Sequence, residues 1–213
     1  RARGFLLGAT SGRTTLGGEG LQHQDGSSHL VAATIPNCKA YDPAYAGEMA
    51  VIIDAGMREM VTEQRDVFYY VTLMNENYAQ PDLPEGTAEG VLRGCYVYKS
   101  YQRLMDKREG PISSKKSVTL MGSGAILTEV VKAAELLAAE GVEVTVISVT
   151  SWSELARDGV ACEQRAIAGD RDGPGTPWLA AQLAATSGPV IAATDYVRAV
   201  PETVRAFVPE GRK

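Results

Sequence analysis

The two histidines of the chain lie close together in one polar, glycine-rich stretch. The stretch reads His23-Gln24-Asp25-Gly26-Ser27-Ser28-His29, and Gly17-Gly18-Glu19-Gly20 comes just before it. Histidine is the side chain that most readily takes up and releases a proton near neutral pH, and glycine lets a ligand approach the main chain. Asp25 could fix a histidine tautomer or hold a polar group of a substrate. The stretch therefore suggests acid–base chemistry, and a solvated loop with incidental histidines is the alternative.

The residues around this stretch predict a first α/β unit over residues 1–85. A short apolar run at 4–10 is typical of a buried strand, and it leads directly into the glycine-rich loop. Residues 44–63 carry apolar side chains three and four apart, which predicts a helix. Residues 67–73 are β-branched and aromatic, which predicts a strand. A long loop that follows a strand is well placed to reach a ligand.

The second half of the chain predicts another α/β unit, over residues 117–213. A strand at 117–121, a helix at 125–140 and a strand at 142–149 form a βαβ pattern, which implies parallel strands. Further along, the sequence predicts a helix at 178–185, a strand at 189–194 and a helix at 200–208. Glycines and prolines punctuate residues 86–116, which favours an interdomain linker with room for one edge strand at 95–101. The predicted fold class is α/β, with two three-layer units and mainly parallel sheets.

Composition excludes several classes of function. The net charge is -5 and the basic residues are scattered, so the chain lacks the electrostatic footprint of a nucleic-acid-binding protein. No apolar run reaches the roughly 20 residues that span a bilayer. Cys38, Cys95 and Cys162 are far apart, which argues against a disulfide framework and a cysteine-rich zinc site. We expect no membrane partner, no nucleic-acid partner and no metal ligand in this chain.

Three further motifs have plain structural explanations. Gly122-Ser123-Gly124 ends a strand and opens a helix, but Leu127 stands where a dinucleotide-binding fingerprint needs its third glycine, so we expect a tight turn. Glu48 lies near the start of a predicted helix, where its charge favours the positive end of the helix dipole. The turn Asn75-Glu76-Asn77-Tyr78 follows a strand, and it could line a cleft or be an ordinary turn.

Taken together, these segments resemble the homodimeric pyruvate dehydrogenase E1 family, whose members belong with the transketolase-like thiamine-diphosphate enzymes. Single tetrapeptides are weak evidence, but their order and spacing along essentially the whole chain are specific. The matching segments are residues 3–26, 34–37, 41–45, 75–78, 122–124, 148–151, 154–159 and 194–196.

The resemblance implies a domain organisation. Residues 1–85 would be the second half of a domain that binds the cofactor's pyrimidine, residues 86–116 a linker, and residues 117–213 most of a truncated transketolase C-terminal-like domain. The chain starts without methionine and lacks the Gly-Asp-Gly motif with a following Asn that holds magnesium in the family. We therefore expect a fragment of a longer polypeptide, with the main cofactor-binding residues outside it.

The resemblance also implies an activity. The complete enzyme would use thiamine diphosphate and Mg²⁺ to decarboxylate pyruvate oxidatively, and would transfer the acetyl group to the lipoyl group of the E2 acetyltransferase. It would be a homodimer in the bacterial cytoplasm. His23 and His29 would be catalytic, and Glu19, Gln22 and Asp25 would belong to the loop that meets substrate and cofactor. Family members often read His-Glu-Asp-Gly-His-Ser-His here, so Gln24 and Ser27 are departures that leave His23 and His29 in place.

Two alternatives remain open at the level of sequence. A transketolase would act on sugar phosphates, but its loop usually reads Gly-Glu-Asp-Gly-Pro-Thr-His, and His23 stands in place of a glycine. The isolated piece could also be a non-catalytic dimerisation or assembly module, and we expect it to be inactive alone.

Overall fold

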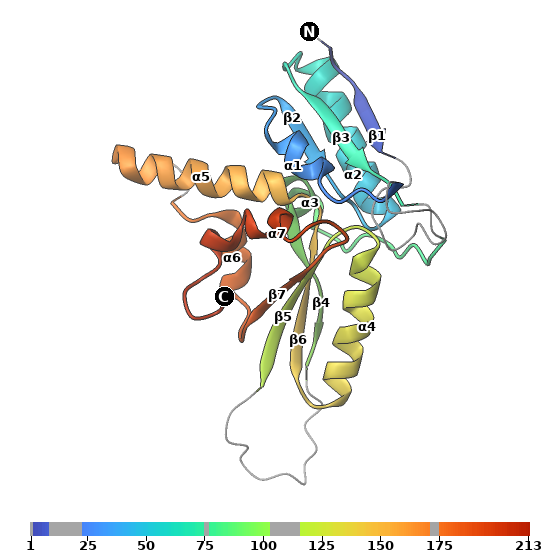
Figure 1. The fold of residues 1–213 in the computed structure, drawn as a ribbon, viewed down its shortest axis with the longest axis vertical. Coiled ribbons are helices and arrows are strands. Elements are labelled where there is room, and N and C mark those ends of the chain that lie inside the picture. Colours follow the sequence, from blue (N-terminus) through green and yellow to red (C-terminus); the bar gives the residue numbers. More distant parts are fainter. Residues whose placement is uncertain (1, 9–22, 75–76, 103–115, 171–174) are drawn as a thin grey trace.

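The computed structural model describes residues 2–8, 23–74, 77–102, 116–170 and 175–213. Two α/β units lie one above the other, each built around its own sheet (Figure 1). The first sheet has the strand order β1-β3-β2 and the second has the order β4-β6-β5-β7. Every neighbouring pair of these strands is parallel except β4 with β6. The predicted α/β class with mainly parallel sheets is confirmed.

The first unit encloses its three-stranded sheet between helices. On one face α2 packs through Ile52 against Tyr69 and Val71 of the sheet, and on the other face Ala32 of α1 packs against Cys38 and Ala40. Because the strands are parallel, their carboxyl ends meet at one edge, which is where α/β proteins gather their sites. The elements are β1 (Phe5–Gly8), α1 (Ser28–Ala33), β2 (Cys38–Tyr41), α2 (Ala46–Met57), a π-helical turn (Arg58–Thr62) and β3 (Phe68–Thr72).

The second unit has a core on each face of its sheet, because alternate residues of a strand point to opposite faces. Val118 and Leu120 of β5 pack with α4, whereas Met121 packs in the cluster that includes α6 and the C-terminal helical turns. Figure 1 shows α4 on one side of this sheet and α6 with α7 on the other. The elements are β5 (Ser117–Gly122), α4 (Ile126–Ala139), β6 (Glu143–Val149), α5 (Trp152–Ala168), α6 (Trp178–Ala184), β7 (Val190–Ala193), α7 (Ala199–Glu202) and a 3₁₀ turn (Arg205–Phe207).

The segment predicted as a linker contains ordered elements. Within residues 86–116 lie the short helix α3 (Ala88–Arg93) and the strand β4 (Cys95–Tyr101). The predicted edge strand is confirmed at these residues, and it pairs antiparallel with β6 at the border of the second sheet. Structurally, β4 therefore extends the second unit, while the exact domain boundaries stay a prediction.

Several elements were not predicted from the sequence, the longest being α5 with 17 residues. Polar and charged residues make up much of this helix and Gly159 lowers its helix propensity, although its buried residues Trp152, Leu155 and Cys162 do recur at helical spacing. The structure shows why a glycine stands there, since an added Cβ would lie 2.3 Å from the ring of Phe207. The Ser151 hydroxyl caps the helix by accepting a hydrogen bond from the Glu154 amide, 3.1 Å away. The short elements α1, β2 and α3 were also missed, and the helix expected at 200–208 is divided into α7 and the 3₁₀ turn.

The predicted turn at residues 122–124 is confirmed, and it joins the two units. Gly124 has a φ of +52°, and an added Cβ would lie 2.8 Å from both carboxylate oxygens of Asp42. Its amide donates to the Asp42 carbonyl at 3.0 Å, and the Asp42 amide donates to the Thr150 carbonyl at 2.7 Å. Gly124 therefore makes room for a residue of the first unit, and main-chain hydrogen bonds fasten that residue from both sides. Among the described residues, no helix is both long and apolar enough to cross a bilayer.

Candidate active site at the junction of the two units

The loop before α1 positions the second histidine. The Asp25 carboxylate accepts hydrogen bonds from the amides of Ser27 and Ser28, at 3.1 and 3.0 Å, and from the Ser28 hydroxyl. These bonds satisfy main-chain groups at the beginning of α1, where the helix itself offers no acceptor. The Gly26 carbonyl accepts from the Val197 amide of the second unit at 2.9 Å. Asp25 therefore shapes the segment that presents His29, and Gly26 attaches it to the other unit.

His29 is buried between the two units, with 4% of its surface exposed. Its Nε2 lies 3.0 Å from Thr72 Oγ1 at the carboxyl end of β3. Its ring packs in an edge-to-face arrangement with the ring of Tyr196 in the second unit, with ring centres 4.7 Å apart. Burial lowers the pKa of His29, although the nearby carboxylates of Asp42 and Asp25 oppose this. His29 is therefore a neutral imidazole near pH 7.

Asp42 follows β2 directly and is also buried. Its Oδ1 accepts hydrogen bonds from the Thr72 hydroxyl at 2.7 Å and from the Tyr196 hydroxyl at 3.4 Å. Its Oδ2 has no hydrogen-bond partner among the described residues. Burial raises the pKa of the Asp42 carboxyl, and the neighbouring His29 and the hydroxyl groups act against that rise. Buried polar atoms are rarely left without a partner, so Asp42 marks an unusual place in the molecule.

Glu48 is also buried, but in contrast to Asp42 both of its carboxylate oxygens accept hydrogen bonds. Its Oε2 accepts from the amides of Ala44 and Tyr45 at 2.6 and 3.1 Å, which caps the start of α2. Its Oε1 accepts from the Tyr96 hydroxyl at 2.8 Å and from the Ser148 hydroxyl, both in the second unit. The contact with the helix start agrees with the structural role expected from its position. The contacts with β4 and β6 show that Glu48 also holds the two units together.

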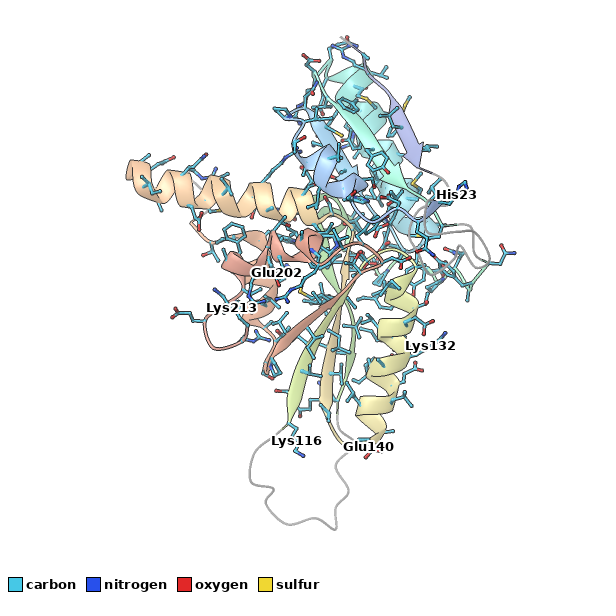
Figure 2. All side chains as sticks on the ribbon, in the orientation of Figure 1. His23, Lys116, Lys132, Glu140, Glu202 and Lys213 are labelled. Carbon is cyan, nitrogen blue, oxygen red and sulfur yellow. The ribbon has the colours of Figure 1, made fainter. Side chains whose placement is uncertain are left out.

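The other predicted site residues lie apart from this cluster or outside the described ranges. His23 is exposed, and Figure 2 shows its side chain on the surface, pointing away from the body of the molecule. Glu19 and Gln22 lie outside the described residues, as do Asn75 and Glu76. No described contact brings His23 and His29 together.

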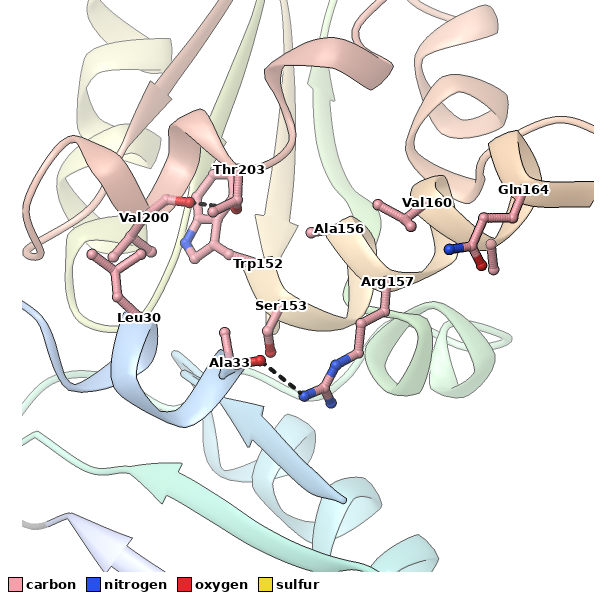
Figure 3. Close-up of a pocket in the computed structure, with 11 residues that line it drawn as sticks. Leu30, Ala33, Trp152, Ser153, Ala156, Arg157, Val160, Gln164, Val200 and Thr203 are labelled. Carbon is pink, nitrogen blue, oxygen red and sulfur yellow. Dashed lines mark hydrogen bonds between the residues drawn. The ribbon is translucent and has the colours of Figure 1, made fainter. Parts of the chain in front are cut away.

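A mainly apolar pocket of about 280 Å³ lies between α1, α5 and α7 (Figure 3). Leu30, the neighbour of His29, lines it together with Trp152 and Val200. Arg157 also lines the pocket, and its guanidinium donates hydrogen bonds to main-chain carbonyls of the first unit, among them Ala33 at 3.4 Å and Ile35 at 2.9 Å. The guanidinium thus fastens α5 to the first unit.

Metal-binding and thiol chemistry find no support in the described residues. They contain no group of three or more histidine, cysteine, aspartate or glutamate side chains that could hold a metal ion. Cys38, Cys95 and Cys162 are buried, and none of the three forms a disulfide bond within the part of the chain that the structure describes. Burial raises the thiol pKa of Cys38 and of Cys95, which disfavours the reactive thiolate.

Sequence reasoning selected His29 but missed its partners Asp42, Thr72 and Tyr196. A local signal existed for two of them. Asp42 and Thr72 stand at the ends of neighbouring parallel strands, and such positions converge at one edge of a sheet. The strand β2 was not recognised, so that signal could not be used.

Comparison with families of known proteins matches both units. Residues 1–81 match the middle domain of the pyruvate dehydrogenase E1 component, and residues 94–210 match the transketolase-like C-terminal domain. Pyruvate dehydrogenase E1 components from Pseudomonas aeruginosa and Escherichia coli K12 are 50% and 48% identical to this chain over 98% of its length. The aligned region covers 23% and 22% of those two proteins, so the chain spans less than a quarter of their length.

Solved structures show the same fold at much lower identity. A transketolase from Campylobacter jejuni aligns over 93% of this chain and 25% of its own, with 16% identity and a TM-score of 0.59. A split-gene transketolase, described as an inactive tetramer, aligns over 96% of this chain and 54% of its own, with 17% identity and a TM-score of 0.57. At this identity the likeness concerns the fold alone.

Proposed function

The chain belongs to the family of pyruvate dehydrogenase E1 components, and from this premise we propose that it forms part of the active site of an enzyme that oxidatively decarboxylates pyruvate. The observation that carries the proposal is the identity of about half of all residues to proteins of that name along 98% of the chain. The complete enzyme would pass the acetyl group to the lipoyl group of the E2 acetyltransferase. It would work as a homodimer in the bacterial cytoplasm.

The proposed division of labour follows the two units. Residues 1–85 would be the second half of the pyrimidine-binding domain, residues 86–116 would connect it, and residues 117–213 would be most of the C-terminal domain. The matched regions, 1–81 and 94–210, support two domains with a short connection between them. The hydrogen bond from the Val197 amide to the Gly26 carbonyl supports a role for the C-terminal unit in holding the described end of the loop.

The cofactors of the proposed reaction are thiamine diphosphate and Mg²⁺. Among the described residues, no group of three or more histidine, cysteine, aspartate or glutamate side chains is placed to hold the metal ion at the diphosphate end of the cofactor. That end of the cofactor would bind to other parts of the polypeptide or to the second subunit. When bound, thiamine diphosphate supplies the carbanion that adds to the carbonyl of a 2-oxo acid and accepts the electron pair left by carbon dioxide.

This chain would contribute the glycine-rich loop to the substrate side of the site. The exposed imidazole of His23 can donate a hydrogen bond to negative charge that develops on a substrate oxygen, or can transfer a proton. His29, buried and neutral, would act with it. Glu19, Gln22 and Asp25 would shape the same loop. The hydrogen bonds that Asp25 accepts at the start of α1 support this role for Asp25.

An assay of the complete enzyme separates this proposal from the transketolase alternative. We expect turnover with pyruvate and an electron acceptor, and none with xylulose phosphate and an aldose acceptor. The opposite result would assign the chain to a transketolase. Turnover with neither substrate would favour a non-catalytic assembly role.

The isolated chain offers a second test. Titration of thiamine diphosphate and Mg²⁺ into the 213-residue chain should give no measurable heat of binding, whereas the complete enzyme should bind both. Binding to the isolated chain would contradict the assignment of the main cofactor-binding residues to other parts of the protein.

A further inference from the structure

A chain of hydrogen bonds leads from His29 into the interior of the junction. Thr72 Oγ1 lies 3.0 Å from His29 Nε2, 2.7 Å from Asp42 Oδ1 and 3.3 Å from the Tyr41 carbonyl oxygen. A threonine hydroxyl has a single hydrogen to donate and two lone pairs that accept. The shortest of the three contacts, to Asp42 Oδ1, takes that hydrogen, because this oxygen also accepts from the Tyr196 hydroxyl and so acts as an acceptor.

The direction of the Thr72 hydrogen determines which ring nitrogen of His29 carries a proton. Because the Thr72 hydrogen points to Asp42, the hydroxyl can only accept from His29, and Nε2 must carry the hydrogen of the neutral ring. Burial lowers the pKa of His29 and keeps the second ring nitrogen without a proton near pH 7. Nδ1 is then the acceptor of the ring, and no described residue makes a hydrogen bond to it.

The second unit holds the far end of this chain in place. The Tyr196 hydroxyl donates to the same oxygen, Asp42 Oδ1, and the Tyr196 and His29 rings pack in an edge-to-face arrangement. Gly124 lies so close to the Asp42 carboxylate that no side chain would fit there. The carboxylate therefore cannot turn away from Thr72 without disturbing the junction.

We infer that Asp42 and Thr72 are positioning residues that fix His29 as the Nε2–H tautomer and so dedicate Nδ1 to accepting a proton. The hydrogen-bond chain from Asp42 through Thr72 to His29 is called the relay below. The inference rests on the proposed function in one respect only, namely that the relay supports turnover. The tautomer itself is a property of the resting protein. The tautomer depends on residues of both units, since Tyr196 and Gly124 of the second unit hold the Asp42 carboxylate in place.

The tautomer can be read directly in the complete enzyme by ¹⁵N nuclear magnetic resonance of histidine-labelled protein. The signals of His29 are identified by their loss in His29→Ala. We expect hydrogen on Nε2 and a bare Nδ1. Thr72→Val keeps the shape of the side chain but removes the hydroxyl, and it should give a mixture of tautomers, while Thr72→Ser should keep the wild-type form. A wild-type ring with hydrogen on Nδ1 would overturn the inference whatever the enzyme's substrate is.

Two substitutions test the Asp42 end in the same way. Asp42→Asn retains a carbonyl oxygen, and two hydroxyl donors face the Oδ1 position, so the amide should seat its oxygen there and preserve the Nε2–H form. Asp42→Leu removes the acceptor, frees the Thr72 hydrogen to turn toward Nε2, and should populate the Nδ1–H form. If that variant does not fold, the Thr72 pair still decides. An unchanged tautomer in Thr72→Val would overturn the inference.

Kinetics then show whether the relay acts through His29. Thr72→Val should lower kcat for pyruvate by about tenfold with little change in KM, and Thr72→Ser should restore most of it. In a His29→Ala background, Thr72→Val should lower kcat no further. If the two effects simply multiply, Thr72 is only structural and the relay is wrong, while pyruvate turnover by the wild type would still uphold the proposed function.

Discussion

His23 lies in the loop before α1 and His29 lies in the first turn of α1, and the two have different physical environments. His23 is exposed on the surface, whereas His29 is enclosed by Thr72 and by the rings of Tyr70 and Tyr196. A side chain on the surface can meet a ligand without contributing to folding. A buried one takes part in both, because removing it leaves a cavity and deprives the Thr72 hydroxyl of one of its hydrogen-bond partners. Substitutions at the two positions should therefore separate catalysis from stability to different degrees.

The largest effect is expected for His23→Ala in the complete enzyme. Turnover of pyruvate should fall by about 10²–10⁴, the usual contribution of a general acid or base, or roughly 3–5 kcal/mol of barrier. The free energy of unfolding should change by about 0.5 kcal/mol or less, as for ordinary surface substitutions. Steady-state kinetics and a thermal melt measure both quantities.

Wild-type turnover combined with a melting temperature several degrees lower would make His23 structural and remove the contrast. Ser27→Ala is a suitable control, since this exposed side chain lies in the same loop and should alter neither property.

His29→Ala should change both properties. Loss of a buried ring and of its hydrogen bond with Thr72 should lower the free energy of unfolding by roughly 2–4 kcal/mol. Turnover should also fall, by a smaller factor than in His23→Ala. Val31→Ala is the matched control, because Val31 lies in the same helix but is 62% exposed. A His29→Ala protein as stable as the wild type would contradict the burial described for this site.

Asp25→Ala should have a smaller effect on stability. It removes the acceptor for the amides of Ser27 and Ser28, and loss of such a helix-start contact costs about 1 kcal/mol. Asp25→Asn retains an acceptor oxygen and should be close to the wild type in a thermal melt. Equal destabilisation by both substitutions would show that the charge of Asp25, and not its hydrogen bonds, supports α1.

The smallest expected effect is on the pH dependence of stability. Burial lowers the pKa of His29 in the folded state, so the unfolded state takes up a proton first as pH falls below about 6.5. The stability that comes from this group is fully present above that pH and is lost as pH falls toward the folded pKa. His29→Gln cannot titrate, so its melting temperature should decline less than that of the wild type between about pH 7.5 and about pH 5.5. An equal decline would indicate that folding does not lower the pKa of His29.

The sequence predicted most of the scaffold because those segments carry strong local patterns. The apolar spacing of α2 and α4 and the β-branched runs of β3, β5 and β6 are readable without tertiary information. In contrast, β2 has only four residues, and its strand character depends on pairing with β3. The helix α5 has few apolar residues and a central glycine, so it was overlooked although its buried residues recur at helical spacing.

The difference between the two histidines could not be predicted for the same reason. Both stand in one polar segment, and nothing nearby in the sequence distinguishes them. His29 is buried by Thr72 and Tyr196, which lie 43 and 167 positions further along the chain. Burial at this site is thus a property of the assembled units, and the resemblance to a known family was needed to select the loop.

The main-chain hydrogen bonds on both sides of Asp42 have a consequence for how the molecule opens. The amide of Asp42 donates a hydrogen bond to the second unit, and the amide of Gly124 donates one to the first. Each of these two amide protons therefore becomes exposed to solvent only when the units separate. Hydrogen–deuterium exchange at these two positions should therefore give one common free energy of opening. Both positions would then report the same event, the separation of the two units, and a substitution that weakens the junction would lower protection at both.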